Sequence, residues 1–167
     1  MIQAMHWRPL STLDLPVVEA LACEIHPAFP EDSAVFAERQ RLYPEGARLF
    51  ELDGVPSGYL FSHPWNWGAF PPLNTLLGAL PALSDTFYVH DLALLNRARG
   101  TGAAAMIVGE ILRHARNLGF ASVSLVAVNG SLPFWHKHGF RAVDVPALQD
   151  KLQSYEKAAR YMSKRLV

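Results

Sequence analysis

A glycine-bearing turn between an apolar run and a helical pattern constrains this chain more than any other feature. The turn reads Arg99-Gly100-Thr101-Gly102-Ala103-Ala104; it follows the apolar run 87–95 and opens a helical pattern over 103–118. Such a turn presents backbone N–H groups at the positive end of a helix dipole, where an anion such as phosphate is favoured. Glycine has no Cβ, so a ligand can approach the backbone closely. The turn therefore predicts a site for a phosphorylated cofactor, and its alternative interpretation is a tight turn without a ligand.

Two other kinds of phosphate loop fit this turn poorly. No Gly-Lys-Ser/Thr follows the glycines, which argues against a P-loop. A dinucleotide-binding unit needs an acidic residue at the end of the next strand, whereas the next apolar run, 121–128, is followed by Asn129. ATP or NAD binding at this turn is therefore the weakest interpretation.

Length and charge narrow the class of protein. The 167 residues, of which 50% are hydrophobic, predict one packed domain over 1–167. Lys and Arg number 15, as do Asp and Glu, so no basic surplus indicates nucleic acid as a partner. The hydrophobic pattern leads us to expect neither a membrane span nor a secretory leader. The single cysteine, Cys23, is expected in the core, and no disulfide within the chain is possible, which favours a cytoplasmic location.

Hydrophobic periodicity and turn residues predict strands that alternate with helices. We expect strands at 2–9, 47–52, 57–62, 87–95, 121–128 and 140–145, and helices at 12–24, 33–42, 103–118 and 131–138. Asp53-Gly54 predicts a hairpin turn, and an apolar insertion at about 64–85 carries Trp65, Trp67 and Phe70. The pattern indicates an α/β or α+β domain with a mixed sheet.

Several segments, in order, resemble the GNAT superfamily of N-acetyltransferases. The glycine turn, preceded by Leu92-Ala93-Leu94, is similar to the family's Arg/Gln-x-x-Gly-x-Gly/Ala pyrophosphate loop. The strand predicted at 122–128 is the second matching segment, because in the family's fold the strand at this place is parallel to the one before the glycine turn. The segment 131–140 then resembles the family's short helix, which ends in a Lys-x-Gly-Phe turn. The closing segment 159–166 resembles the family's last strand, so we predict a strand there although local propensity favours a helix.

The resemblance implies a mixed, mostly antiparallel sheet with a splayed pair of parallel strands, helices on both faces, and acetyl-CoA as co-substrate. A splayed strand has unpaired backbone groups, which the amide-rich pantetheine arm would bond. The pyrophosphate would lie on N–H groups of the turn, and the N–H of Leu94 is expected to bond the thioester carbonyl. The residues expected to bind the cofactor are Leu92, Ala93, Leu94, Arg99, Gly100, Thr101, Gly102, Ala103, Ala104, Asn129, Phe134, Trp135 and Lys137.

Two of these positions depart from the family pattern, and the role of a third stays open. Trp135 stands where the family often has a tyrosine that protonates the leaving thiolate. Indole cannot supply a proton at neutral pH, so Trp135 is expected to pack against neighbouring side chains and to line the CoA channel. Asn129 lies six residues before Trp135 instead of seven, and either contacts pantetheine or is a turn residue. Arg99 either contacts phosphate or serves the structure.

His90 is the expected general base, because histidine titrates near neutral pH. The alternative for His90 is a core histidine held by hydrogen bonds. Asp91 is the second candidate base and points to the opposite face of the strand. Tyr88 shares the face of His90 and is expected to hold a water or to act as the acid. The histidines lack acidic or cysteine neighbours at ligand spacing, so we predict no metal site.

These features predict an acetyl-CoA-dependent N-acetyltransferase that acts on a primary amine of a small molecule, by direct attack in a ternary complex. The alternatives are a catalytically weak or inactive acyl-CoA-binding module, because of Trp135, and a protein lysine or N-terminal acetyltransferase. The carboxylates of Glu24, Glu31 and Asp32 either attract a cationic amine or form solvated surface. The aromatic residues of the insertion cover the acceptor, pack a homodimer interface or fold back on the core.

Overall fold

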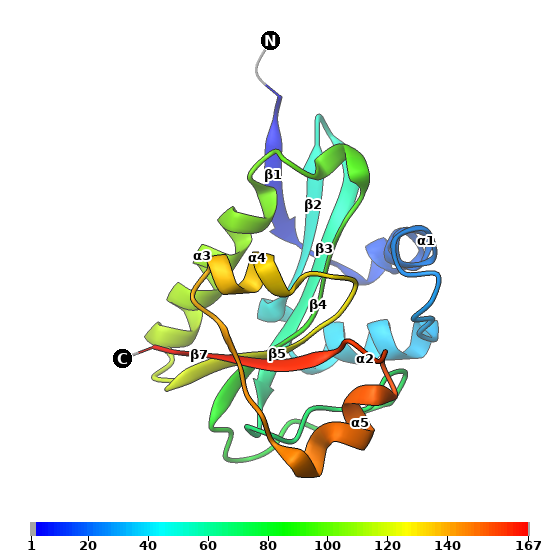
Figure 1. The fold of residues 1–167 in the computed structure, drawn as a ribbon. Helices are drawn as coiled ribbons and strands as arrows, with labels where there is room; N and C mark the ends of the chain where they lie inside the picture. The colour runs from blue at the N-terminus through cyan, green and yellow to red at the C-terminus, as the bar shows by residue number, and fades with distance from the viewer. Residues whose placement is uncertain (1–2, 167) are drawn as a thin grey trace. The chain divides into compact units, whose positions relative to one another are not determined.

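The computed structural model describes residues 3–166, whose strands form one mixed seven-stranded sheet in the order β1-β2-β3-β4-β5-β7-β6 (Figure 1). The strands are β1 (Met5–Pro9), β2 (Ala47–Leu52), β3 (Val55–Trp65), β4 (Thr86–Leu94), β5 (Ser122–Ala127), β6 (Arg141–Ala142) and β7 (Arg160–Arg165). The α-helices are α1 (Leu15–Ile25), α2 (Ser33–Leu42), α3 (Ala103–Asn117), α4 (Leu132–Lys137) and α5 (Gln149–Gln153). Short 3-10 helices cover Thr12–Asp14, Pro44–Gly46, Asn96–Ala98 and Pro146–Leu148.

The direction of the strand pairs confirms the predicted sheet. Strands β4 and β5 are parallel, whereas β1–β2, β2–β3, β5–β7 and β6–β7 are antiparallel. The chain divides into two compact units. The N-terminal unit comprises Met1–His63 and His90–Ile107, and the C-terminal unit comprises Pro64–Val89 and Val108–Val167. The predicted single domain over 1–167 stays a prediction.

In the N-terminal unit, α1 and α2 pack on one face of β2, β3 and the second half of β4. The buried side chains of this core are Leu10, Val18, Leu21, Phe36, Ala47, Leu49, Tyr59, Phe61 and Ala93. The β2–β3 hairpin turns at Asp53 and Gly54, both with positive φ (52° and 78°), which is the backbone that an Asp-Gly turn of this length requires. The turn predicted there is therefore confirmed.

Trp7 of β1 ties the first turn of α3 to the sheet of the N-terminal unit. Its indole N–H donates to the carbonyl of Ala103 at 3.0 Å, and its ring lies 5.1 Å from that of Phe50. Buried Trp side chains normally find such a partner for the N–H. This bond holds the helix terminus that follows the glycine turn.

In the C-terminal unit, the apolar insertion folds back on the core. Phe70 is fully buried and stacks on Tyr161 of β7 at 5.4 Å between ring centroids. Tyr88, Leu152 and Ala159 complete this buried cluster. Of the three roles open to Phe70, packing into the core is the one observed.

Several predicted element boundaries, and the predicted burial of Cys23, need correction. The strand predicted at 140–145 is reduced to Arg141–Ala142, because Phe140 packs edge-on against Trp135 of α4 instead of joining a ladder. The predicted insertion begins inside β3, which runs to Trp65. Cys23 is exposed on α1, so its predicted core position is wrong. The first predicted strand begins at Met5 instead of residue 2, which lies outside the described residues. The predicted last strand is confirmed as β7.

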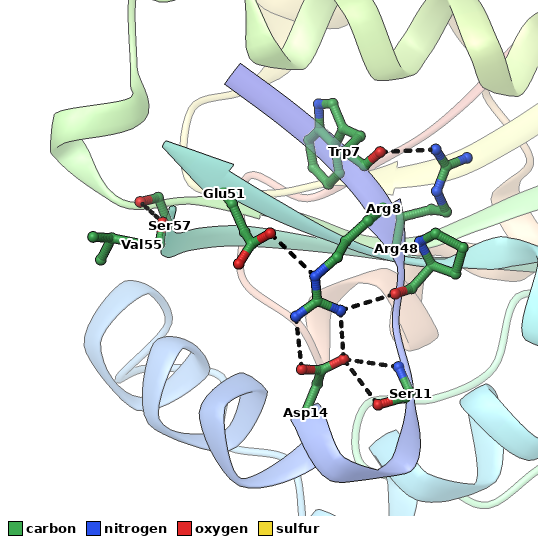
Figure 2. A network of polar contacts seen from close by, with 9 residues as sticks. Trp7, Arg8, Ser11, Asp14, Arg48, Glu51, Val55 and Ser57 are labelled. Carbon is green, nitrogen blue, oxygen red and sulfur yellow. Dashed lines mark hydrogen bonds and ion pairs between the residues drawn. The ribbon is translucent and has the colours of Figure 1, made fainter. Parts of the chain in front are cut away.

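Arg8 of β1 anchors the start of the helical layer in the N-terminal unit (Figure 2). Its guanidinium donates to both carboxylate oxygens of Asp14 at 2.8 and 2.9 Å, and to Glu51 of β2 at 3.2 Å. Asp14 also accepts the backbone N–H of Ser11 at 2.8 Å, so its carboxylate caps the start of this helical segment. The hydrogen bond from Arg8 lowers the pKa of Asp14 to about 2.

We expect Asp14→Asn to lower the free energy of unfolding at pH 7, because it removes the ion pair with Arg8 and weakens the cap at Ser11. The expected decrease is about 1 kcal/mol, since solvent screens this partly exposed pair. A carboxylate with a lowered pKa stabilises the fold above its ordinary pKa, and this contribution is lost as pH falls from about 4 toward 2. Urea unfolding of wild type and variant at several pH values measures the difference, with exposed Asp144→Asn as control. A difference that stays constant down to about pH 2.5, in the lower part of this window, would contradict the assignment.

Candidate functional site

The glycine turn has the backbone that an anion site needs. Gly100 and Gly102 have φ values of 76° and 91°, and a Cβ built at either position would meet no atom within 4 Å. Backbone conformation, and not packing, therefore demands glycine, and the space above the turn is open. The Thr101 hydroxyl donates to the Ala98 carbonyl at 2.6 Å, while Arg99 is exposed. The first N–H groups of the 15-residue α3 have no partner within the helix, so Arg99–Ala104, hereafter the cofactor loop, fits a pyrophosphate.

Strand β4 changes its surroundings along its length. The parallel ladder joins Phe87, Tyr88 and Val89 to residues 123–125 of β5, and β4 then continues for five residues to Leu94. The His90 side chain is only 3% exposed although the residue as a whole is half-buried, so its exposed surface is mostly main chain. An accessible main chain at this point of β4 is what a bound amide-rich arm requires.

His90 pairs with a carboxylate that sequence reasoning did not connect to it. His90 Nε2 lies 2.9 Å from Glu31 Oε1, and the Glu31 side chain is 5% exposed. An ionised carboxylate only accepts, so Nε2 carries the proton and Nδ1 carries the lone pair in the neutral imidazole. Nδ1 is buried and has no hydrogen-bond partner within the described residues. A basic ring nitrogen is thus held in place by an orienting carboxylate and left available for a proton.

Asp91 has both carboxylate oxygens engaged. Oδ2 accepts the Tyr59 hydroxyl at 2.7 Å, and Oδ1 lies 3.1 Å from His26 Nε2. Burial and the neighbouring charge of Asp91 raise the pKa of Tyr59, which therefore stays a donor. Burial lowers the pKa of His26, but the hydrogen bond and charge of Asp91 outweigh burial, and the net pKa is raised. Of the two candidate bases, His90 is the one with a free nitrogen.

A groove of about 740 Å³ lies within the N-terminal unit, along the end of β4 and the segment that follows it. Its lining includes Glu24 and Ile25 of α1, Leu94 of β4 and Arg99 of the cofactor loop. Arg97, also in the lining, donates to Ser57 at 3.0 Å and to the Pro56 carbonyl at 2.8 Å. The exposed Glu24 and Leu94 of β4 therefore line the same groove.

The other predicted site residues lie in the C-terminal unit. Tyr88 is 1% exposed in the core described above. Trp135 is buried between Phe134 and Phe140, at ring distances of 5.0 and 5.2 Å. Asn129 has a φ of 56°, as in a turn, and its N–H donates to Glu156. Lys137 is exposed at the end of α4. The roles predicted for these residues stay predictions.

Sequence reasoning missed three partners of the site: Glu31 as the partner of His90, and His26 and Tyr59 as the partners of Asp91. Each lies at least 32 positions in the chain from the β4 residue that it contacts, and His26 and Glu31 flank a proline-containing loop without a recognisable motif. In the described part of the chain no three potential metal ligands gather, and no helix there is long and apolar enough to cross a membrane. The cytoplasmic location and the homodimer stay predictions.

Comparison with known proteins identifies the family. The model of the acetyltransferase (GNAT) family matches residues 14–140, so the chain belongs to this family. Acyltransferase activity and acetyl-CoA as co-substrate, which the sequence resemblance implied, follow from this membership. A comparison with curated protein sequences finds no match.

Solved structures share the fold over nearly the whole chain. Ard1 from Thermoplasma volcanium has a TM-score of 0.74 at 17% identity, covering 98% of this chain and 99% of that one. The GphF GNAT-like decarboxylase, solved with isobutyryl-CoA, has a TM-score of 0.80 at 16% identity, with coverages of 97% and 100%. Arabidopsis thaliana Naa50, solved with the bisubstrate analogue CoA-Ac-MVNAL, has a TM-score of 0.71 at 15% identity, with coverages of 96% and 97%.

The His26–Asp91 pair predicts a specific pH dependence. A histidine whose pKa is raised in the folded state stabilises the fold fully below its ordinary pKa of about 6.5. That contribution is lost as pH rises through the raised folded pKa. His26→Gln should therefore lower the free energy of unfolding by a larger amount at about pH 5.5 than at about pH 9. An NMR titration that places the His26 pKa below about 6.5 would contradict this.

Proposed function

We propose that this protein is an N-acetyltransferase that transfers the acetyl group of acetyl-CoA to a primary amine of a small molecule, by direct attack in a ternary complex. The observation that carries the proposal is His90: a buried imidazole oriented by Glu31, with its second nitrogen free. A buried nitrogen without a partner costs free energy, which a substrate proton would recover.

The cofactor loop and β4 would hold the co-substrate. The N–H groups of residues 100–104 bind the pyrophosphate, and the main chain of Leu92, Ala93 and Leu94 bonds the pantetheine arm. Bound acetyl-CoA supplies the thioester. In the C-terminal unit Asn129, Phe134, Trp135 and Lys137 are the further contacts that the family resemblance suggests.

Each step needs one of the chain's own groups. The acceptor amine must be neutral to attack, so His90 Nδ1 takes its proton while Glu31 stabilises the imidazolium. The new bond joins the amine nitrogen to the acetyl carbon, the thioester C–S bond breaks, and the sulfur leaves as thiolate, which takes up the second proton that the nitrogen loses as the amide forms. The N–H of Leu94 donates to the carbonyl oxygen as negative charge develops there. Tyr88 is retained as a candidate acid, although its burial argues for packing.

Glu24 supports a cationic acceptor. Glu24 is exposed and lines the same groove as Leu94, whereas Glu31 is already bonded to His90. An amine in its ammonium form would be attracted to Glu24 before it loses a proton to His90. A protein lysine or N-terminus has the same charge and is the lesser alternative for the acceptor.

The competing function is an acyl-CoA-binding module without catalysis. Trp135 favours it, because this residue is buried among aromatic rings and offers no proton to a leaving thiolate. The two functions agree on cofactor binding and differ on turnover, so a binding assay and an amine-panel activity assay separate them.

We expect acetyl-CoA at about 100 times its dissociation constant to raise the melting temperature by about 5–11 °C, and ATP and NAD to leave it unchanged. Gly102→Val should abolish this shift, because a branched side chain would stand where the pyrophosphate lies. Gly119→Val is the matched control, since Gly119 has a similar φ of 82° and equally open space. A normal shift in the Gly102 variant would remove the cofactor loop from the site.

We expect His90→Ala to lower turnover by about 10²–10⁴-fold with little change in acetyl-CoA affinity. Glu31→Gln should lower turnover less, because it leaves the ring nitrogen in place but weakens its orientation. The control is exposed His6→Ala. Steady-state kinetics with a responsive amine give turnover, and calorimetry gives affinity. Unchanged turnover in His90→Ala would leave His90 as a structural histidine.

A further inference from the structure

A second groove, of about 560 Å³, lies within the C-terminal unit and takes no part in the proposed reaction. It is lined by Trp67, Ala121, Ser122, Gly139, Arg141, Val143, Ser163, Lys164 and Arg165. None of these belongs to β4 or the cofactor loop. Three of the lining residues are cationic and none is acidic, so the groove is electropositive. Its volume falls in the range of small-ligand sites, about 300–1,000 Å³.

Two arginines gather on one face of the sheet in this groove. Arg141 of β6 is paired with Ser163 of β7, and Arg165 lies two residues further along β7, paired with Ser122 of β5. Paired residues share a face, as do residues i and i+2, so both arginines point to the same side as diagonal cross-strand neighbours. Like charges at such positions repel each other.

Neither guanidinium has a hydrogen bond or ion pair with any other of residues 3–166. Lys164 differs, because its ammonium donates to the His138 carbonyl at 2.8 Å. The two arginines therefore have unused donors that face one groove. A bound phosphate would accept from both and relieve their repulsion.

Trp67 forms an aromatic wall beside these arginines. Its indole N–H donates to Ser163 at 3.2 Å, and its backbone N–H donates to Asp85 at 2.7 Å. Tyr161 meets the ring edge-on at 5.7 Å, and 42% of Trp67 stays exposed. The indole is thus held from several sides and still offers surface to a planar ring.

We propose that this groove, hereafter the arginine groove, binds a nucleoside phosphate: the phosphate lies between Arg141 and Arg165, and the base stacks on Trp67. A planar ring linked to a phosphate is the ligand class that uses both features of the groove. Inorganic phosphate would use the arginines alone, and a neutral aromatic compound would use only the indole.

Calorimetric titration of the full chain with AMP tests this proposal, with and without saturating acetyl-CoA, which keeps AMP from the cofactor loop. We expect binding in both conditions, weakening with salt. The double variant R141Q/R165Q should lose at least about tenfold in affinity. The matched control R113Q/R116Q changes the charge equally on exposed arginines of α3 and should lose less than about twofold.

Two further probes separate the parts of the site. Trp67→Leu should weaken AMP binding by at least about fivefold and leave ribose 5-phosphate binding unchanged. No AMP binding, unchanged binding in R141Q/R165Q, or an equal loss in both double variants would overturn the proposal. Ribose 5-phosphate binding as tight as AMP would reduce the groove to a phosphate site and overturn the stacking. If acetyl-CoA itself fails to bind, the proposed function is wrong, and the titration without acetyl-CoA still measures AMP binding to the arginine groove.

Discussion

The close approach of β3 to β4 at Gly58 is the constraint on which the N-terminal site depends. A Cβ at this position would stand 2.6 Å from the Ala93 carbonyl and 2.5 Å from the Leu94 side chain, so only glycine permits this strand spacing. The Leu95 N–H donates to the Ser57 carbonyl at 2.9 Å, beside that contact. The same pairing brings Tyr59 to Asp91. The pairing of these two strands therefore positions the accessible backbone and the charged side chains of β4 together.

The adjacent residues His90 and Asp91 of β4 differ in how completely their side chains are hydrogen-bonded. Asp91 is held from two sides by donors; it raises the pKa of His26 against the effect of burial, and it adds to the effect of burial in raising the pKa of Tyr59. His90 points to the other face, where one carboxylate orients the ring and leaves a nitrogen free. Strand alternation separates a saturated carboxylate from an imidazole that can accept a proton. The proposed general base and the carboxylate held by His26 and Tyr59 are thus consecutive residues of β4.

Most of the fold could be predicted because its signals are local. Asp53-Gly54, the glycines of the cofactor loop and the helical pattern after Ala103 each act through the backbone of their own segment. Strand β7 was predicted through the family resemblance and against its propensity, since pairing with β5 decides its conformation. Local pattern failed at Cys23, whose small apolar side chain stays exposed, and at 140–145, where packing of Phe140 on Trp135 ends the strand.

The sequence by itself determined the family and the glycine turn before α3, and it predicted a cofactor site at that turn and a base at His90, because these depend on residue types at short spacing. Only the tertiary structure decided which carboxylate orients His90, which groups surround Asp91, and that Arg141, Arg165 and Trp67 meet in one groove. Those contacts join segments far apart in the chain. Their free energy arises from burial and strand register, which no local pattern encodes.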